Sequence, residues 1–254
     1  MAGHSKWANI KHRKAAVDKK RGKIWSKCSR AIMAAARTGG PDPTSNLALR
    51  YAIDEARYAN MPKDTIQRAI DKGSGAGGGE DFAAMSYEGY GPSGVAVIVD
   101  ALTDNRARTA PEVRGIFAKY GGNLGATGCV GYMFETKGRI LVAGSVAEDA
   151  VMEAALEAGA EDVVAPEPVD DDPGAWAILT GPADFAGVKD AVERAGIEIM
   201  DAEITKIPGN TVLLAGDDAK RLLGLIEALE DNDDVQKVYT NADIPDDVLA
   251  ALGQ

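Results

Sequence analysis

The sequence predicts an α+β protein with an N-terminal helical bundle followed by two ferredoxin-like α+β domains. Three observations support this class. Apolar residues recur with helical spacing through residues 1–75, a glycine-rich linker follows at residues 73–81, and four strand-like segments beyond residue 82 each precede a helix-like segment. With 254 residues, 45% of them hydrophobic, the chain can form two or three compact domains.

Three helices are expected in the N-terminal bundle. The first spans residues 19–37, the second begins after Ser45, and the third is short and capped by Asp64. Their inward faces are predicted to comprise Ile24, Cys28, Ala31, Ile32 and Ala35; Leu49, Ala52, Ile53 and Ala56; and Ile66, Ala69 and Ile70. On the first helix, Lys23, Lys27, Arg30 and Arg37 fall on a neighbouring arc, which is therefore expected to meet phosphates.

Beyond the linker, strand and helix patterns alternate. The predicted units are strand 94–102 with helix 111–120, strand 139–143 with helix 148–158, strand 176–180 with helix 185–195, and strand 211–215 with helix 219–230, before a last strand at 235–239. These units suit two sandwiches in which helices cover one face of an antiparallel sheet. A doubly wound parallel sheet is the alternative.

Charge is divided unevenly along the chain. Residues 1–75 carry 16 Lys/Arg and 6 Asp/Glu, a net charge of +10, whereas residues 76–254 carry 12 and 33, a net charge of −21. The acidic part repels a phosphate backbone, so a nucleic acid can only be approached through the N-terminal part.

The first thirty residues give the clearest functional pattern. They hold ten Lys/Arg against one acid, Asp18, with Trp7 and Trp25 interleaved. Lys and Arg neutralise phosphates, and an indole can stack on an unpaired base, although Trp25 also suits the bundle core. The predicted nucleic-acid-binding residues here are Lys6, Trp7, Lys11, His12, Arg13, Lys14, Lys19, Lys20, Arg21, Lys23, Lys27 and Arg30.

A second basic cluster follows the first predicted strand and contains Arg106, Arg108 and Arg114. The segment 109–112 (TAPE) reads as a capping box that opens the next helix, and a helix N-terminus attracts anions. A second nucleic-acid contact is therefore expected here. The alternative is that Arg106 and Arg108 pair with neighbouring acids.

Catalytic, metal and cofactor chemistry have no good host. The histidines, His4 and His12, both lie in the basic arm, no GxSxG motif occurs, and His4, His12 and Cys28 lack metal-ligand spacing. The run 170–172 (DDD) is expected at a solvated hairpin tip. The glycine-rich run 121–128 reads as tight turns after a helix, with a partner contact as the alternative.

Location is inferred from what the sequence lacks. No apolar run is long enough for a bilayer, and the basic N-terminus has no apolar segment of the kind found in signal peptides. A mitochondrial transit peptide is the alternative for that terminus. Cys28 and Cys129 form no disulfide framework, so a cytoplasmic protein is expected.

Several short motifs together resemble a known family, YebC/PmpR, which includes the mitochondrial translational activator of cytochrome oxidase. The matching motifs are residues 1–14 (MAGHSKWANIKHRK), 60–63 (NMPK), 87–92 (YEGYGP), 103–106 (TDNR), 121–125 (GGNLG) and 133–134 (MF). Ala107 and Cys129 stand where the family pattern has Asn and Ser. The resemblance covers residues 1–240. It implies a basic helical domain at 1–75, a discontinuous middle domain at 82–130 plus 207–245, and an inserted acidic domain at 131–206.

The resemblance also implies a role in gene expression. Such proteins are described as DNA-binding transcriptional regulators, and also as ribosome-associated translation factors that bind ribosomal RNA and relieve stalling at proline-rich stretches. The leading hypothesis is therefore a non-enzymatic nucleic-acid-binding regulator with no metal, cofactor, membrane or small-molecule partner. An adaptor whose acidic body binds a basic protein, and an enzyme using His4 and His12, are the alternatives.

Overall fold

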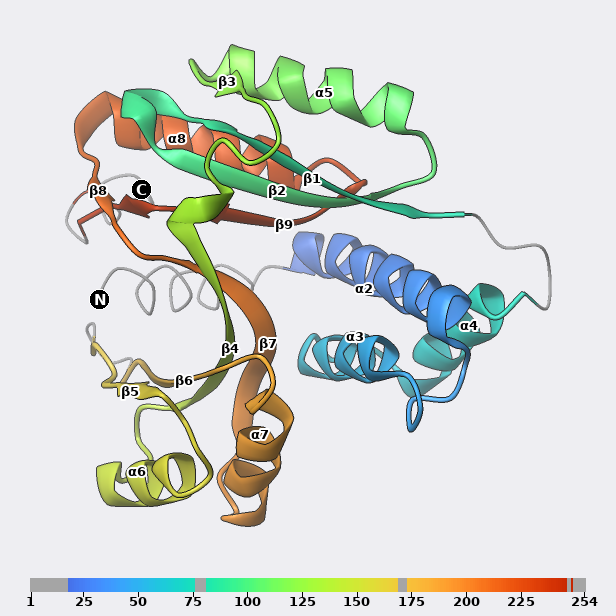
Figure 1. Ribbon diagram of the computed structural model, residues 1–254, viewed down its shortest axis with the longest axis vertical. Coiled ribbons are helices and arrows are strands. Elements are labelled where there is room, and N and C mark those ends of the chain that lie inside the picture. The colour runs from blue at the N-terminus through green and yellow to red at the C-terminus, as the bar shows by residue number, and fades with distance from the viewer. Residues whose placement is uncertain (1–17, 76–80, 169–172, 246–247, 249–254) are drawn as a thin grey trace. The chain divides into compact units, whose positions relative to one another are not determined.

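The computed structural model describes residues 18–75, 81–168, 173–245 and 248, with side chains from residue 22 onward (Figure 1). The described chain divides into two compact units. One unit comprises Lys19–Phe134 together with the chain from Pro208 onward, and the other comprises Glu135–Ile207. The predicted α+β class is confirmed, because both units contain helices packed with sheets and the first also carries a separate helical bundle.

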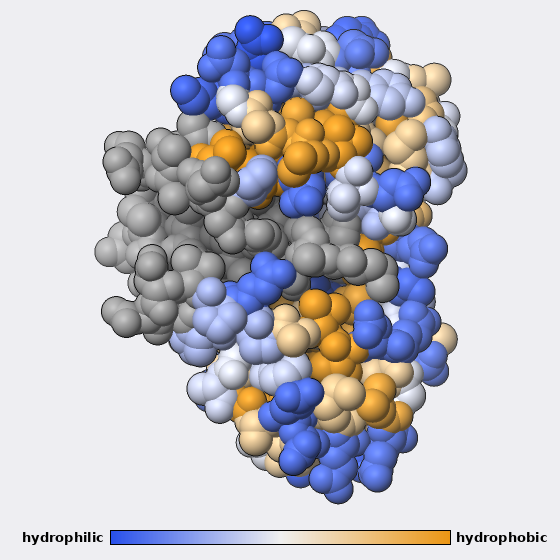
Figure 2. Space-filling model, turned by 90° about the vertical axis from the view of Figure 1, so that its left-hand side faces the viewer, coloured by the Kyte–Doolittle hydropathy of each residue, from blue (hydrophilic) through white to orange (hydrophobic). Residues whose placement is uncertain are grey.

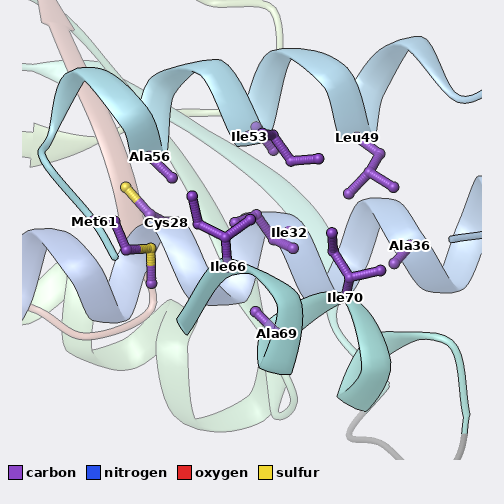
Figure 3. Close-up of a cluster of buried hydrophobic side chains, with 11 residues drawn as sticks. Cys28, Ile32, Ala36, Leu49, Ile53, Ala56, Met61, Ile66, Ala69 and Ile70 are labelled. Atoms are coloured by element: carbon purple, nitrogen blue, oxygen red, sulfur yellow. The ribbon is translucent and has the colours of Figure 1, made fainter. Parts of the chain in front are cut away.

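Three helices form the N-terminal bundle: α2 (Asp18–Gly39), α3 (Leu47–Tyr58) and α4 (Lys63–Gly73). Their apolar faces meet in one core (Figure 3). The buried members are Cys28, Ile32, Ala36, Leu49, Ala52, Ile53, Ala56, Met61, Ile66, Ala69 and Ile70. The core therefore forms where the 3.6-residue spacing predicts it.

The turn between α2 and α3 is fixed by Asn46. Its side-chain oxygen accepts a hydrogen bond from the Leu49 main-chain N–H at 3.1 Å, which caps α3. Its side-chain nitrogen donates to the carbonyls of Ala35 and Gly40, each at 2.8 Å. Gly40 has a φ of +87°, so this exit from α2 needs a glycine.

The predicted cap of α4 is wrong. Pro62 occupies the cap position with a φ of −60° and no side-chain cap bond, and Asp64 lies in the first turn instead. Proline has no side-chain acceptor, so the helix starts from its main-chain carbonyl, which accepts hydrogen bonds from Thr65 at 2.9 Å and Ile66 at 3.1 Å.

The middle domain is an antiparallel sheet of β1 (Ala83–Tyr90), β2 (Ala96–Thr103), β3 (Asn123–Leu124) and β9 (Val235–Thr240), in the order β3-β1-β2-β9. Helices α5 (Arg106–Lys119) and α8 (Gly216–Glu230) lie on one face of this sheet (Figure 1). Gly89 lies against Phe117 of α5, and Gly91 lies against Leu222 and Leu225 of α8. Short 3₁₀ turns, η1 (Pro92–Gly94) and η2 (Gly131–Met133), complete the connections.

The connectivity of the middle domain departs from the predicted strand–helix alternation. β1 was not expected, because its sequence, AAMSYEGY, mixes exposed and buried positions and contains a charge and a glycine. It joins β2 directly through η1. The predicted strand 211–215 is reduced to β8 (Val212–Leu213), which pairs in parallel with β10 (Ala242–Asp243) outside the four-stranded sheet.

The second unit contains β4 (Phe134–Ala143), α6 (Glu148–Leu156), β5 (Asp162–Val164), β6 (Ala175–Thr180), α7 (Phe185–Arg194) and β7 (Ile199–Pro208). The sheet order is β5-β6-β4-β7, the ferredoxin-like arrangement of a βαββαβ chain. β6 runs antiparallel to both β4 and β5, so the doubly wound parallel alternative is wrong. The run Asp170–Asp172 lies outside the described residues.

Candidate nucleic-acid interface

Many of the predicted phosphate-binding residues lie beyond what the structure describes. Lys6, Trp7, Lys11, His12, Arg13 and Lys14 are outside the described residues. Lys19, Lys20 and Arg21 belong to α2, but their side chains are not among those described. The described part of the candidate interface therefore consists of Lys23, Lys27 and Arg30 on α2 and of Arg106, Arg108 and Arg114 on α5.

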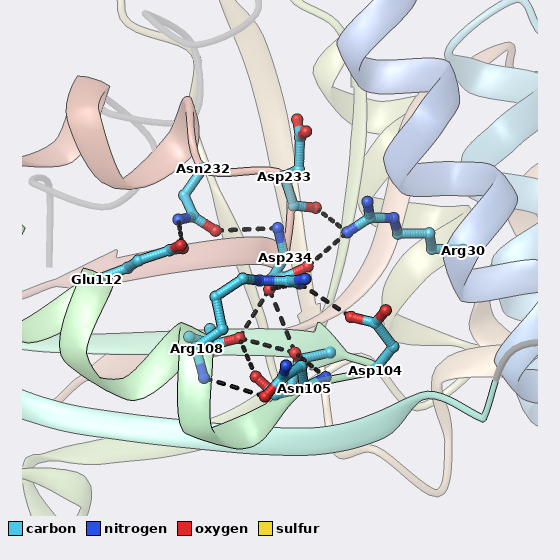
Figure 4. Close-up of polar contacts among 10 residues, drawn as sticks. Arg30, Asp104, Asn105, Arg108, Glu112, Asn232, Asp233 and Asp234 are labelled. Carbon is cyan, nitrogen blue, oxygen red and sulfur yellow. Dashed lines mark hydrogen bonds and ion pairs between the residues drawn. The ribbon is translucent and has the colours of Figure 1, made fainter.

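The α2 residues Lys23, Lys27 and Arg30 contact the turn that joins α8 to β9, and we call residues 230–234 the acidic turn. The Lys23 ammonium lies 2.8 Å from the Asp231 carboxylate, and Lys27 donates to the Glu230 carbonyl at 2.7 Å. Arg30 donates to the Asp233 carbonyl and pairs with the Asp234 carboxylate at 2.9 Å (Figure 4). Three members of the arc expected to meet phosphates thus meet oxygen atoms of the middle domain, and the fourth, Arg37, pairs with the Asp81 carboxylate.

Helix geometry explains this match. Residues 23, 27 and 30 are spaced by four and three positions, so their side chains project from one face of α2. The acidic turn follows the C-terminus of α8, where main-chain carbonyls lack partners within the helix and the helix dipole is negative. Cations from α2 therefore satisfy carbonyl groups that α8 cannot satisfy itself.

Asp234 is the centre of the contact, and its side chain is only 4% exposed. One carboxylate oxygen accepts hydrogen bonds from Arg108 at 2.7 Å, from Thr109 at 2.7 Å and from Thr103 at 3.2 Å, while the other faces Arg30 (Figure 4). Burial raises the pKa of Asp234, but hydrogen bonds from Arg108, Thr109 and Thr103 outweigh burial and hold that pKa below its ordinary value. Asp234 is thus a buried, charged acceptor.

The second basic cluster is divided by the structure. Arg108 pairs with the carboxylates of Asp234 and, at 2.9 Å, of Asp104. The alternative that this arginine pairs with neighbouring acids is therefore confirmed. Arg106 and Arg114 are exposed on α5. Arg108 is also 44% exposed, so what sets it apart from Arg106 and Arg114 is its pairing with two carboxylates.

The predicted capping box at residues 109–112 is wrong. α5 begins at Arg106, and Asn105 is its cap, accepting a hydrogen bond from the Arg108 main-chain N–H at 3.1 Å. Thr109 lies inside the helix, where its hydroxyl donates to Asp234 or back to the Asn105 carbonyl. Asn105 lies two residues after the end of β2, so its Asx cap starts α5 before the chain reaches Thr109.

Trp25 belongs to the bundle. Its ring packs against the core, and its indole N–H donates to the Ala59 carbonyl at 2.9 Å. The expectation that Trp25 packs in the bundle core is therefore confirmed.

Glu88, which sequence reasoning missed, organises the glycine-rich run. Its buried carboxylate accepts main-chain hydrogen bonds from Gly128 at 2.8 Å, Val130 at 2.9 Å and Gly131 at 2.7 Å. Gly122 lies against the Tyr90 carbonyl, so the run folds tightly onto β1. The run thus combines turns with the short strand β3, and the signal that could have revealed Glu88 is an acid inside a partly apolar strand.

Other chemistries find little support in the described residues. Among them, no group of three or more His, Cys, Asp or Glu side chains is arranged to hold a metal ion. No helix in the described segments combines the length and apolarity needed to cross a membrane. On the face drawn in Figure 2, apolar side chains form separate patches bordered by hydrophilic ones.

Comparisons with known proteins agree with this architecture. The N-terminal domain of the TACO1/YebC proteins matches residues 5–76, and the second and third domains match residues 82–242. The transcriptional regulatory protein PmpR of Pseudomonas aeruginosa is 56% identical over 253 residues, covering 100% of both chains. A probable transcriptional regulatory protein of Methylococcus capsulatus is 55% identical, again over 100% of both.

A solved structure supports the same relationship. The crystal structure of a conserved hypothetical protein from Aquifex aeolicus superposes with a TM-score of 0.80 at 48% sequence identity, covering 91% of this chain and 93% of that one. The family domains together span nearly the whole chain, and the relatives match it from end to end. The chain is therefore a member of the TACO1/YebC family.

Proposed function

We propose that this protein is a non-enzymatic, DNA-binding regulator of transcription in the cytoplasm, and that it grips phosphate through its basic N-terminal region. The observation that carries the proposal is the charge division, +10 over residues 1–75 and −21 over residues 76–254. Relatives that match the full chain are named transcriptional regulatory proteins, which supports the same conclusion.

The proposal gives each region a role. The basic helical domain, residues 1–75, supplies most of the phosphate contacts, while the inserted acidic domain, residues 131–206, stays away from the polyanion. Arg106 and Arg114 are exposed and can add contacts. Arg108 is held by Asp104 and Asp234, so it acts through the position of α5 rather than through phosphate.

The first prediction concerns salt and truncation. Binding of a fluorescent DNA duplex, followed by anisotropy, should weaken by about 10³-fold between roughly 50 and 200 mM salt if six phosphates are contacted. Deleting residues 1–17 removes Lys6, Lys11, Arg13 and Lys14, so most of this affinity and the steepness of the salt dependence should be lost.

Matched variants on the body provide the control. Arg106→Ala with Arg114→Ala should weaken binding, whereas Lys220→Ala with Arg221→Ala, which removes two exposed cations of α8, should not. Undiminished binding by the truncated chain contradicts the proposal. An RNA hairpin of equal charge is titrated in parallel, and a clear preference for it would favour the RNA-binding alternative over DNA.

A further inference from the structure

The basic face of α2 already has oxygen partners, and these have the chemistry of a phosphate backbone. Lys23 pairs with the Asp231 carboxylate, and Lys27 donates to the carbonyl of Glu230 at the end of α8. Arg30 donates to the Asp233 carbonyl and pairs with the Asp234 carboxylate. Phosphate oxygens would take the same donors through the same charge-assisted hydrogen bonds. The acidic turn and a nucleic acid therefore compete for one set of cations.

The junction that holds this face is polar. The described apolar core of the bundle is built from residues 28–70, whereas the apolar cluster on the β1–β2–β9 sheet is built from residues 90–239. Besides the contacts of the acidic turn, Lys237 of β9 pairs with Glu55 of α3 at 3.1 Å, and the Arg30 guanidinium lies 5.8 Å from the Phe82 ring centre. The Lys23–Asp231 and Lys237–Glu55 pairs are partly exposed and individually weak. Asp234 is buried, but it keeps its hydrogen bonds from Arg108, Thr109 and Thr103 when Arg30 leaves, so the junction can open while both cores stay intact.

We propose that the acidic turn is a latch, which holds Lys23, Lys27 and Arg30 against the middle domain until a nucleic acid takes them over. This inference rests on the proposed function and adds regulation to it. In the latched state only the cations outside this contact are available. The apparent affinity is therefore lowered by the fraction of molecules whose latch is closed.

Two isosteric substitutions on the turn distinguish release of the latch from a general loss of negative charge. Asp231→Asn removes the negative charge that pairs with Lys23, whereas Asp233→Asn removes an equal charge from a carboxylate that points away from Arg30 (Figure 4). Both variants make the protein less acidic by one unit. With a latch, Asp231→Asn should bind the DNA duplex about two- to fivefold more tightly than Asp233→Asn, the range expected for one exposed ion pair.

A tether tests the latch in the opposite direction. The variant Lys23→Cys, Asp231→Cys, Cys129→Ser is joined across the turn by a short bis-maleimide, and the same variant capped with N-ethylmaleimide is the control. Native Cys28 is buried, with its pKa raised to about 12 by burial and by Glu55, so it should not react. Tethering should deny Lys27 and Arg30 to phosphate, which lowers the slope of log affinity against log salt by about 2.

The outcomes distinguish the two proposals. If the wild-type chain shows no salt-dependent binding of DNA or RNA, the proposed function fails and the latch fails with it. If the wild type binds but the tethered and capped forms have equal slopes, the latch alone is overturned, whatever the two Asn variants do. Equal affinities of Asp231→Asn and Asp233→Asn also overturn it.

Discussion

Asp234 shows how a single buried charge can join three parts of a chain. It lies just before β9, yet its carboxylate is approached by Arg30 from α2 and by Arg108 and Thr109 from α5. Its main-chain carbonyl also accepts a hydrogen bond from Leu102 of β2 at 2.8 Å. Because a buried carboxylate without partners is costly, the arrangement stabilises the fold only while Arg108, Thr109 and Thr103 satisfy it.

Replacing Asp234 should therefore lower the free energy of unfolding more than the loss of one small side chain would. Asp234→Asn keeps the shape but loses the charge that two arginines face, and we expect the free energy of unfolding at pH 7 to fall by about 2–3 kcal/mol. Because the folded pKa is lowered, this stabilisation is present above the unfolded pKa of about 3.9 and disappears as pH falls through the folded value. Urea unfolding between pH 7 and pH 3 measures both effects.

The control for this prediction is its neighbour on the same turn. Asp233 is exposed, so Asp233→Asn should change the stability by no more than about 0.5 kcal/mol. A difference between wild type and Asp234→Asn that stays constant down to pH 3 would show that the carboxylate charge is not the cause.

At the scale of elements, the glycine-rich run shows why β3 is short and why it pairs at all. β3 aligns Asn123 with Tyr90 and Leu124 with Gly89. The main chain passes close to β1 there, since a Cβ on Gly122 would lie 2.5 Å from the Tyr90 carbonyl oxygen. Glu88 holds the far end of the run through three main-chain N–H groups. Small residues and one carboxylate thus replace a longer strand pairing.

A pair of glycine substitutions tests this account. Gly122→Ala should lower the free energy of unfolding by about 1–3 kcal/mol, because the new methyl group meets main chain that cannot move aside. Gly115→Ala, on an exposed position of α5 with open space around it, should raise the stability by up to about 1 kcal/mol. Thermal unfolding of both variants checks the contrast, and a neutral Gly122→Ala would show that β3 is not held as tightly as described.

The sequence patterns predicted the helices of the bundle more accurately than they predicted which side chains contact one another. The helices of the bundle follow the spacing of residues such as Ile32, Leu49 and Ile66, and each of these is buried. β5 and β8 were missed or overextended because runs of two or three residues carry no detectable period, and the longer strands β1 and β7 were missed because their buried residues do not alternate regularly. Caps were misplaced at Asp64 and Thr109, where several polar residues compete for one position.

The partners of the basic arc could not be read from the chain. Lys27 and Glu230 are 203 positions apart, and no local pattern links them. The amphipathic spacing correctly placed Lys23, Lys27 and Arg30 on one face of α2 but left open what that face meets. Phosphate was the natural expectation for a row of cations, whereas the fold supplies a helix terminus.

At the scale of the whole molecule, the unit of residues 135–207 has the features of an independent folding unit. Its sheet is closed on one face by buried side chains of α6 and α7, including Val151, Phe185 and Val188. Trp176 is buried and donates its indole N–H to the Val146 carbonyl at 3.2 Å. β4 and β7, which begin and end the unit, are neighbours in its sheet.

We therefore expect a fragment of residues 134–208 to fold when expressed alone. Trp176 is the single tryptophan within it, so a blue-shifted emission that moves to the red in one cooperative urea transition is the expected result. Val188→Asp, which buries a charge under α7, should abolish the transition. A fragment with red-shifted emission and no helical circular dichroism would contradict the prediction.

The pairing of β2 with β9 can form only late during synthesis on the ribosome. β2 ends at Thr103, but its partner strand is complete only at Thr240, after the ferredoxin-like unit has been made. At a synthesis rate of about 5–20 residues per second, β9 is completed roughly 7–27 s after β2. During that interval β2 can pair with β1, but its other edge stays open although its residues are almost all buried in the finished fold, and such an open edge is prone to aggregation.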